Sequence, residues 1–590
     1  MNRVTARRAL AATLGLLCSF AVLAGCTTVS GVATPVVSTR PVGGGPSITD
    51  PATAGSPEPG AHPGTSTTAS ADRPTSVPAS TSPQTSSDPW LPTAIPPLPP
   101  AEPATTSPAT TSAGNPDPSG PTEPAPTNPP LTDSTPPATD GAPVTGSDGA
   151  GDPYYPTSGN GGYDVASYSV VLTYQPSTDD LTATNTIKAS VTTRAPLARF
   201  DLDLQPQLQV DSVQIDGTAA AFTQSQAELV ITPAAPLPPA SDVTIVVAYH
   251  GKPSAVKGGT ADLGDGGWYR TTDGGAVAAG EPYSASSWYP VDEHPSDTAA
   301  FSVTATVPDG WDVISNGLKF AGALPAAPAG MQTTRYDQKE AIASYLTTIL
   351  IDKLDFTTDT FDGKPILNAF TSAAKNDGNE NLAQNTAKIL QVEQNLFGPF
   401  PFDSYGGIFT GQPLTFALET ATRPVYANWV DLDTMIHETA HQWFGDDVTL
   451  AQWKDVCLNE CFASYAPWLY HETVDGSDLD AQWKQEMAQV AGDRSFWSSP
   501  LVDMGAGNEF SAVYDRGPLA LHALRHEMGD EKFFAMLKGW IATYGGKNAS
   551  FNDFEAYASS VAGTDLSGFI DAWFRGTVVP PDPYRHPPGL

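Results

Sequence analysis

Apolar and polar residues alternate along the chain between about residues 161 and 345. The residues at every second position of two such stretches are Tyr168, Val170, Leu172 and Tyr174, and Phe301, Val303, Ala305 and Val307. A period of two is typical of strands that bury one face. The apolar run at 243–249 predicts instead a strand buried on both faces. We therefore expect an antiparallel β-sheet domain over residues 155–345.

The spacing of apolar residues becomes helical after about residue 379. Two sets recur at intervals of three or four, namely Ile389, Val392 and Leu396, and then Phe533, Leu537, Trp540, Ile541 and Tyr544. Ser550, followed by Asp553, is typical of a helix start. The pattern predicts a mainly helical domain over residues 346–579 and an irregular proline-rich tail at 580–590. The fold class is therefore α+β multidomain.

The first 25 residues form a third pattern. Three arginines precede an apolar stretch from Ala9 to Leu23, and the sequence Leu-Ala-Gly-Cys ends at Cys26. Such a segment is typical of a secretory signal peptide and is too short for a lasting membrane span. Its ending resembles a bacterial lipobox, which implies that Cys26 is acylated and becomes the mature N-terminus. The alternative is an ordinary secreted protein in which Cys26 is a free thiol.

Residues 26–150 are rich in Pro, Thr, Ser, Ala and Gly and contain no Lys, Phe or Tyr. Such a segment cannot bury enough apolar surface to offset the entropy of the chain, so we expect a disordered tether. A tether behind an acylated cysteine predicts a protein anchored to the cell membrane by lipid. Its folded domains would then face the cell wall or the exterior, outside the cytoplasm.

The charge of the chain excludes one class of partner. The 590 residues include 29 basic and 64 acidic side chains, which give a net charge of −35. A nucleic-acid surface needs clustered Lys and Arg, so we expect no nucleic acid to bind. Anionic headgroups would repel such a chain, so membrane attachment is expected to depend on acylated Cys26. The four cysteines are too few for a disulfide-built scaffold.

The candidate chemistry lies in the helical part. The pentapeptide His-Glu-Thr-Ala-His runs from His437 to His441 and places two imidazoles one helical turn apart. Glu460 follows after 18 intervening residues and can supply a third ligand. Three protein ligands leave the fourth zinc position open, which is typical of a catalytic site. We expect one zinc ion per chain, with Glu438 beside it as the base that takes a proton from water.

These residues, with their spacing, resemble the M1 family of zinc aminopeptidases. Three further stretches resemble family motifs: His-Gln-Trp-Phe-Gly-Asp at 441–446, Leu-Asn-Glu-Cys-Phe-Ala at 458–463 and Val-Tyr-Asp-Arg-Gly at 513–517. The resemblance extends from about residue 155 to residue 579. It implies an N-terminal β-sheet domain followed by a thermolysin-like catalytic domain.

The resemblance also implies roles for three residues. Tyr514 would stabilise the oxyanion that forms during hydrolysis. Glu419, which lies in Phe-Ala-Leu-Glu-Thr where the family has Gly-x-Met-Glu-Asn, would bind the free α-amine of the substrate. Glu281 stands where the family has a Gln or Glu that helps to hold the same amine. The alternatives are a packing role for Tyr514 and solvated loop positions for the two glutamates.

Two further features of this chain differ from what is usual in the family. The chain ends without room for the large helical C-terminal domain of many members, so we expect a short form with a more open cleft. Cys457 and Cys461 stand where the family usually has Trp and Gly. They can form a disulfide or can pack as small apolar residues, and their separation in a regular helix favours packing.

The remaining histidines are expected to be ordinary, with no second ligand at metal spacing. They include His294, His471, His522 and His526.

The sequence thus predicts a zinc aminopeptidase that acts on peptides outside the cytoplasmic membrane. Because the Glu419 region departs from the family motif, an M1-like endopeptidase or oligopeptidase is one alternative. A combined peptidase and epoxide hydrolase is another, without a supporting motif. A non-enzymatic envelope lipoprotein is the third, although all three ligands and Glu438 are present.

Overall fold

The computed structural model describes residues 141–590 except 258–259 and 261–262. The predicted signal peptide, Cys26 and most of the predicted tether lie outside the described residues. The described residues belong to one compact unit. Among them, no helix combines the length and the apolar character needed to cross a membrane.

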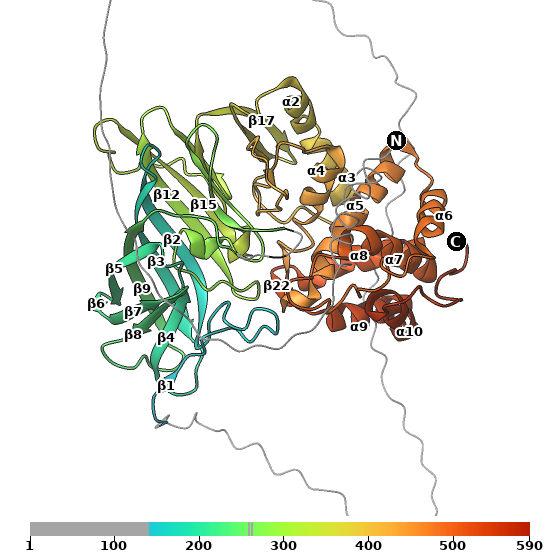
Figure 1. The fold of residues 1–590 in the computed structure, drawn as a ribbon, viewed down its shortest axis with the longest axis horizontal. Coiled ribbons are helices and arrows are strands. Elements are labelled where there is room, and N and C mark those ends of the chain that lie inside the picture. Colours follow the sequence, from blue (N-terminus) through green and yellow to red (C-terminus); the bar gives the residue numbers. More distant parts are fainter. Residues whose placement is uncertain (1–140, 258–259, 261–262) are drawn as a thin grey trace, which may run out of the picture. The chain divides into compact units, whose positions relative to one another are not determined.

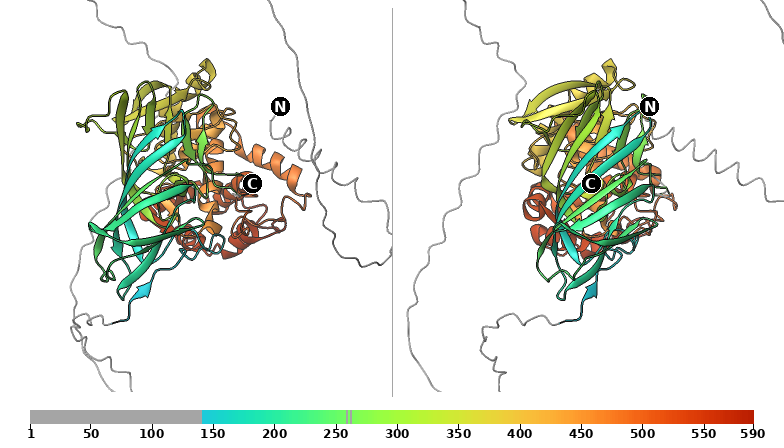
Figure 2. Two further views of the ribbon diagram at one scale, coloured as in Figure 1. Left: turned by 60° about the vertical axis from the view of Figure 1, so that its left-hand side comes forward. Right: turned by 90° about the vertical axis from the view of Figure 1, so that its left-hand side faces the viewer.

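An eight-stranded sheet dominates the first domain, and most of its strands can be followed in Figure 1. In spatial order its strands are β14 (Leu318–Lys319), β15 (Met331–Ala343), β12 (Thr298–Pro308), β2 (Tyr163–Gln175), β3 (Asp180–Val191), β9 (Asp242–Gly251), β5 (Leu208–Ile215) and β6 (Thr218–Ala219). The alternation is confirmed in β12 and, from Tyr168 onward, in β2, since every second residue there is buried. The sheet covers one side of the helical domain (Figure 2).

Two details of this sheet differ from the prediction. β12 pairs with β2 in parallel, whereas every other pairing in the sheet is antiparallel. The reason is that β12 joins the edge of the β2–β3 hairpin after a long connection, not through a tight turn. In β9, Val243, Ile245 and Val247 are buried but the residues between them are partly exposed. The prediction of burial on both faces is therefore wrong, because one face of the sheet is partly solvated here.

Two smaller sheets complete the β-rich domain. One has the order β1 (Val144–Thr145), β4 (Leu197–Asp203), β8 (Glu228–Thr232) and β7 (Ala221–Ser225). The other has the order β10 (Gly267–Arg270), β11 (Ala276–Ala279), β16 (Ile349–Asp352) and β13 (Asp312–Ser315). The structure therefore differs from the predicted boundaries at both ends. β1 lies inside the segment predicted as tether, and β16 lies beyond residue 345. A two-residue strand is too short to show a period.

A third four-stranded sheet leads into the helical domain, with β17 (Leu354–Phe361), β18 (Lys364–Thr371), β19 (Ile408–Phe409) and β20 (Val425–Tyr426). The helices are α2 (Asp377–Ala383), α3 (Thr386–Phe397), α4 (Leu432–Ala440), α5 (Cys457–Asp475), α6 (Leu479–Val490), α7 (Val513–Met528), α8 (Asp530–Tyr544), α9 (Phe551–Ala562) and α10 (Ser567–Ile570). β21 (Val448–Leu450) pairs with β22 (Lys547–Ala549).

The helical predictions are confirmed at three places. α3 and α8 contain the two predicted apolar sets, and Ser550 caps α9 in a capping box with Asp553. The tail at 580–590 contains no helix or strand. α5 lies between α4 and α7, and its contact with α7 depends on Gly517. A Cβ at Gly517 would lie 2.9 Å from the Cα of Cys461, so a larger residue would push the two helices apart.

Candidate metal centre and active site

Two helices bring the three predicted metal ligands together. Asp431 caps the N-terminus of α4, and its side chain accepts a hydrogen bond of 3.0 Å from the backbone N–H of Thr434. Nε2 of His437 and Nε2 of His441 then lie 3.1 Å apart at the end of this helix. Oε2 of Glu460, in the first turn of α5, lies 3.2 Å from the former nitrogen and 3.5 Å from the latter. The three ligand atoms converge on one point.

These separations fit a zinc ion. Tetrahedral coordination with bonds of about 2.0–2.1 Å places ligand atoms about 3.3–3.5 Å apart. The separations here are 3.1, 3.2 and 3.5 Å. Two imidazoles and one carboxylate are also the donor set of many catalytic zinc sites, in which the fourth position stays open. The residues present therefore suit zinc in both geometry and chemistry.

Neighbouring groups favour the protonation states in which these ligands can bind a metal. Nδ1–H of His441 donates to the carbonyl of Phe444 at 3.0 Å, which leaves Nε2 free to coordinate. Burial lowers the pKa of His437 and so favours its neutral form. Burial opposes ionisation of Glu460, but the two imidazoles outweigh it and lower the pKa of its carboxyl to about 2. Glu460 is therefore present as the carboxylate.

Glu438 lies next to this group without belonging to it. The residue is 5% exposed, and a carboxylate oxygen of Glu438 lies within 4.8 Å of a carboxylate oxygen of Glu419 and of a ring nitrogen of His441. Burial raises the pKa of Glu438 well above its usual range, and the charges of Glu419 and Glu460 add to this effect. A carboxylate with a raised pKa is a competent general base beside a metal centre.

Glu281 and Glu419 complete a group of buried carboxylates. Carboxylate oxygens of Glu281, Glu419 and Glu460 lie within 4.8 Å of one another. Glu281 is 3% exposed, and its Oε1 has no hydrogen-bond partner. The alternative of solvated loop positions is therefore wrong for both predicted glutamates. Burial and the neighbouring charge of Glu419 raise the pKa of Glu281 well above its usual range, so this space favours a cation.

Sequence reasoning missed two residues that position Glu419. Nε2 of Gln442 donates to the backbone carbonyl of Glu419 at 3.0 Å, and its Oε1 accepts from the backbone N–H of Thr422 at 2.8 Å. The hydroxyl of Tyr345 donates to Oε1 of Glu419 at 3.2 Å. Gln442 directly follows the ligand His441, which is the one sequence signal that could have found it. Tyr345 has no such signal.

The loop that carries Glu281 depends on a close approach of two backbones. Gly280 lies against Gly266, and a Cβ at position 280 would lie 2.3 Å from the Cα of Gly266. Any larger residue at position 280 would displace the loop and with it the carboxyl of Glu281.

Tyr514 is on the open side of the centre, in the first turn of α7. Its ring centroid is 6.0 Å from that of His437, and the residue is 39% exposed. A tyrosine that served only to pack the core would be buried. The exposed position next to a ligand therefore fits a group that meets a substrate.

The two cysteines next to Glu460 form a disulfide, so the predicted preference for apolar packing is wrong. Cys457 is the first residue of α5, and its Cα lies 4.8 Å from that of Cys461. This distance is within the usual range for a disulfide. The prediction assumed that a regular helix would hold the two residues too far apart for a disulfide. At the first turn of α5 they are close enough to form one.

The expectation that the other histidines have no second ligand nearby is wrong for two of them. His522 and His526 lie one turn apart on α7, and their ring nitrogens lie within 4.8 Å of each other and of Asp480. Asp480 stands in the first turn of α6, and nothing in the sequence connected it with either histidine.

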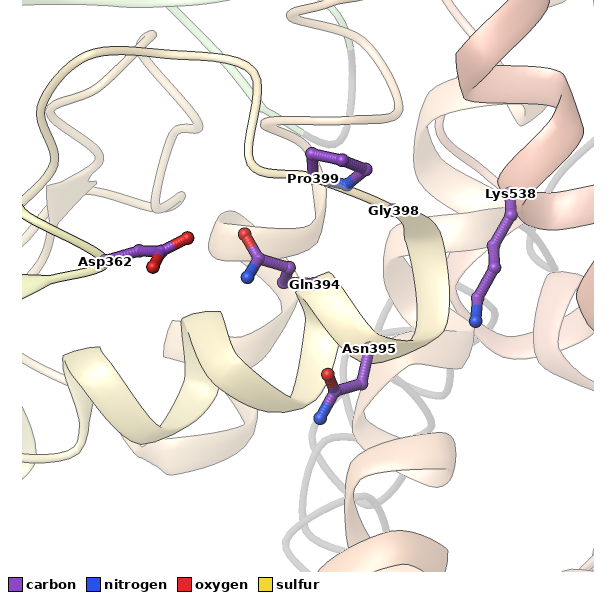
Figure 3. A pocket seen from close by; sticks show the side chains of 6 residues that line it. All are labelled: Asp362, Gln394, Asn395, Gly398, Pro399 and Lys538. Atoms are coloured by element: carbon purple, nitrogen blue, oxygen red, sulfur yellow. The ribbon is translucent and has the colours of Figure 1, made fainter. Parts of the chain in front are cut away.

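A surface hollow of about 420 Å³ lies apart from these groups (Figure 3). Its lining residues are Asp362, Gln394, Asn395, Gly398, Pro399 and Lys538. It contains no histidine or cysteine and a single carboxylate, so the catalytic chemistry lies elsewhere.

Comparison with known proteins gives one family. The peptidase family M1 domain matches residues 406–573. Aminopeptidase N of Streptomyces lividans is 24% identical over 317 residues, which cover 48% of this chain and 36% of that protein. Tricorn protease-interacting factor F2 of Thermoplasma volcanium is 22% identical over 313 residues, with coverages of 48% and 39%. The aligned part is thus little more than a third of the length of these relatives.

Solved structures give a more complete match. A mutant two-domain M1 zinc metallopeptidase bound to L-arginine superposes with a TM-score of 0.66 at 28% identity, covering 74% of this chain and 99% of that chain. A mutant M1 zinc metallopeptidase from Deinococcus radiodurans, bound to a Tyr-Ser-Ala substrate, gives a TM-score of 0.65 at 28% identity, with coverages of 74% and 100%.

Proposed function

Because this chain belongs to the M1 zinc metallopeptidases and holds both domains of the two-domain neighbour, we propose that it is a zinc-dependent aminopeptidase that removes N-terminal residues from peptides. The observation that supports this proposal is the group of Glu281 and Glu419. Two buried carboxylates lie beside the metal ligands, and Oε1 of Glu281 has no partner. An α-ammonium group would supply the missing cation.

Three ligands, His437, His441 and Glu460, would hold the zinc ion. When bound, zinc supplies a Lewis acid that polarises the scissile carbonyl and lowers the pKa of water. Glu438 takes a proton from the attacking water and then passes it to the nitrogen of the leaving amine. The hydroxyl of Tyr514 donates a hydrogen bond to the oxyanion that develops on the carbonyl.

Binding of the substrate amine sets the position of cleavage. If Glu281 and Glu419 hold the α-ammonium next to the metal ligands, the first peptide bond is the one that reaches Glu438. Peptides with a blocked N-terminus would leave both carboxylates buried and without a cation, which is costly. The arrangement therefore favours removal of one N-terminal residue over internal cleavage.

A panel of aminoacyl chromogenic substrates tests this proposal. The purified protein should hydrolyse substrates with a free amine, lose this activity with a chelator and regain it with zinc. N-acetylated versions of the same substrates should be poor. Efficient cleavage of acetylated peptides would instead support an endopeptidase, and no hydrolysis of any peptide by the zinc-loaded protein would exclude an enzyme of this class.

We also propose that the protein is a lipoprotein that acts outside the cytoplasmic membrane. The support comes from sequence alone, namely the signal segment that ends at Cys26 and the composition of residues 26–150. Cys26→Ala should move the protein from the membrane fraction to the soluble fraction. If the variant remains with the membrane, acylation of Cys26 is not what holds the protein there.

A further inference from the structure

A second histidine pair lies far along the chain from the proposed zinc centre. His522 and His526 lie one turn apart on α7, and both turn Nε2 toward the same atom, Oδ1 of Asp480 on α6. The two N···O distances are 3.1 Å from His522 and 2.8 Å from His526. All three atoms lie within 4.8 Å of one another. This arrangement provides two imidazoles and one carboxylate, as the proposed zinc centre does.

The second nitrogen of each ring is also engaged. Nδ1 of His526 lies 3.3 Å from the carbonyl oxygen of Pro588, and Nδ1 of His522 lies 2.8 Å from the hydroxyl of Tyr465. A carbonyl can only accept, so this contact is a hydrogen bond in the tautomer that carries its hydrogen on Nδ1. In that tautomer Nε2 turns its lone pair toward Oδ1 of Asp480, and a cation bound by both atoms would stabilise the group. A metal ion is such a cation, and a backbone carbonyl on the other nitrogen is the usual outer contact of a metal-binding histidine.

The surroundings permit a cation to enter and stay. The side chains of Asp480 and His526 are 38% and 20% exposed, so the group is open to solvent on one side. Arg525 lies on the same helix, but its guanidinium forms ion pairs with Glu472 and Asp530, with N···O distances of 2.7 and 2.8 Å. The local positive charge is therefore compensated.

We propose that Asp480, His522 and His526 form a second metal site, for a divalent transition-metal ion such as Zn²⁺. Two nitrogens and one oxygen suit this class of metal better than Mg²⁺ or Ca²⁺, which prefer oxygen ligands. The ion would fasten α6 to α7, and through His526 and Pro588 it would also hold the C-terminal tail (Figure 1). The residue after His522 is Ala523, so this site lacks the carboxylate that Glu438 places beside the first histidine pair.

The test counts zinc ions in the full chain. Protein incubated with excess Zn²⁺ and then desalted should contain two zinc ions per chain by mass spectrometry. His526→Ala should contain one and keep its peptidase activity. Glu460→Ala should also contain one, without activity, and the double variant should contain none. This design separates the second site from the catalytic site, because each variant empties one of them.

A matched control is His471→Ala. His471 also contacts two aspartates, but through different nitrogens, Nδ1 to Asp475 at 2.6 Å and Nε2 to Asp433 at 2.8 Å, so the two carboxylates do not converge on one atom. This variant should keep two zinc ions. Asp480→Asn, at a partly exposed position, repeats the test if His526→Ala folds poorly. The proposal would be overturned by one zinc ion in the wild type, or by two zinc ions in both Asp480→Asn and His526→Ala. The contacts of Asp480 with the two histidines would then be explained by a shared proton.

Discussion

Two helices of this protein carry a pair of histidines with the same spacing, α4 and α7. In each pair the ring nitrogens meet a carboxylate from a neighbouring helix, Glu460 for α4 and Asp480 for α7. The residue after the first histidine differs: it is Glu438 in α4 and Ala523 in α7. The surroundings differ as well, because three buried glutamates lie near the α4 pair.

The difference shows that a ligand set alone does not make an enzyme. Both pairs offer two imidazoles and a carboxylate. Of the two, the α4 pair alone has Glu438 beside it, which we propose as the base, and two further buried carboxylates that we propose bind an ammonium group. It also has a tyrosine, Tyr514, that is exposed next to a ligand. The reactivity of a metal site depends on such neighbours as much as on its ligands.

The largest effect is expected from Glu438→Gln. The amide cannot accept the proton from water, so kcat should fall by about 10²–10⁴. Zinc content should not change, since Glu438 is not a ligand. Turnover and metal content are measured on the same samples. The control is the matched change at the α7 pair, Asp480→Asn, which should leave turnover unchanged. Normal turnover of Glu438→Gln would contradict the assigned base.

Tyr514→Phe should lower kcat by about 10²–10³ with little change in KM, because one donor to the oxyanion is lost. The ring remains, so folding and metal content should be unaffected. The α7 pair provides the control: Tyr465 contacts His522 at 2.8 Å, and Tyr465→Phe should leave kcat unchanged. Equal activity of the two variants would mean that Tyr514 has no part in the reaction.

Residue spacing was sufficient to predict the elements with a strong period. The alternation around Val170 and Val303 predicted β2 and β12, and the helical spacing predicted α3 and α8. Their pairing was not accessible, because β12 joins β2 in parallel from a distant part of the chain. Strand partners depend on tertiary packing, which a local period does not contain.

The same limit applies to the site. A helix fixes the relation of His437 to His441, so their convergence followed from spacing. Glu460 follows after 18 intervening residues on another helix, so the sequence offered it as a third ligand without fixing its distance from the histidines. Asp480 lies 42 residues before His522, and no spacing rule connects it with the α7 pair.

A smaller effect is expected at the two carboxylates proposed to bind the ammonium group. Glu281→Gln should lower kcat/KM for free-amine substrates by about 10–100-fold, since one partner of a buried charge is lost. Glu419→Gln should do the same, and the two losses should not add, because both carboxylates act on one ammonium. Slow cleavage of acetylated peptides should be unchanged. An equal loss on free and acetylated substrates would show that these residues only support the fold.

The smallest effect concerns stability at the α7 pair and is measured without catalysis. In Glu460→Ala, which should no longer hold the catalytic zinc, the second site is the remaining place for Zn²⁺. A ligand at about 100 times its Kd stabilises the folded state by about 2.7 kcal/mol. In a domain of this size that energy raises Tm by a few degrees, and we expect about 2–5 °C. Adding His526→Ala should abolish the shift, whereas adding His471→Ala should preserve it. If zinc raises Tm equally in all three proteins, the stabilising ion binds elsewhere, and the α7 pair is held together by a proton instead of a metal.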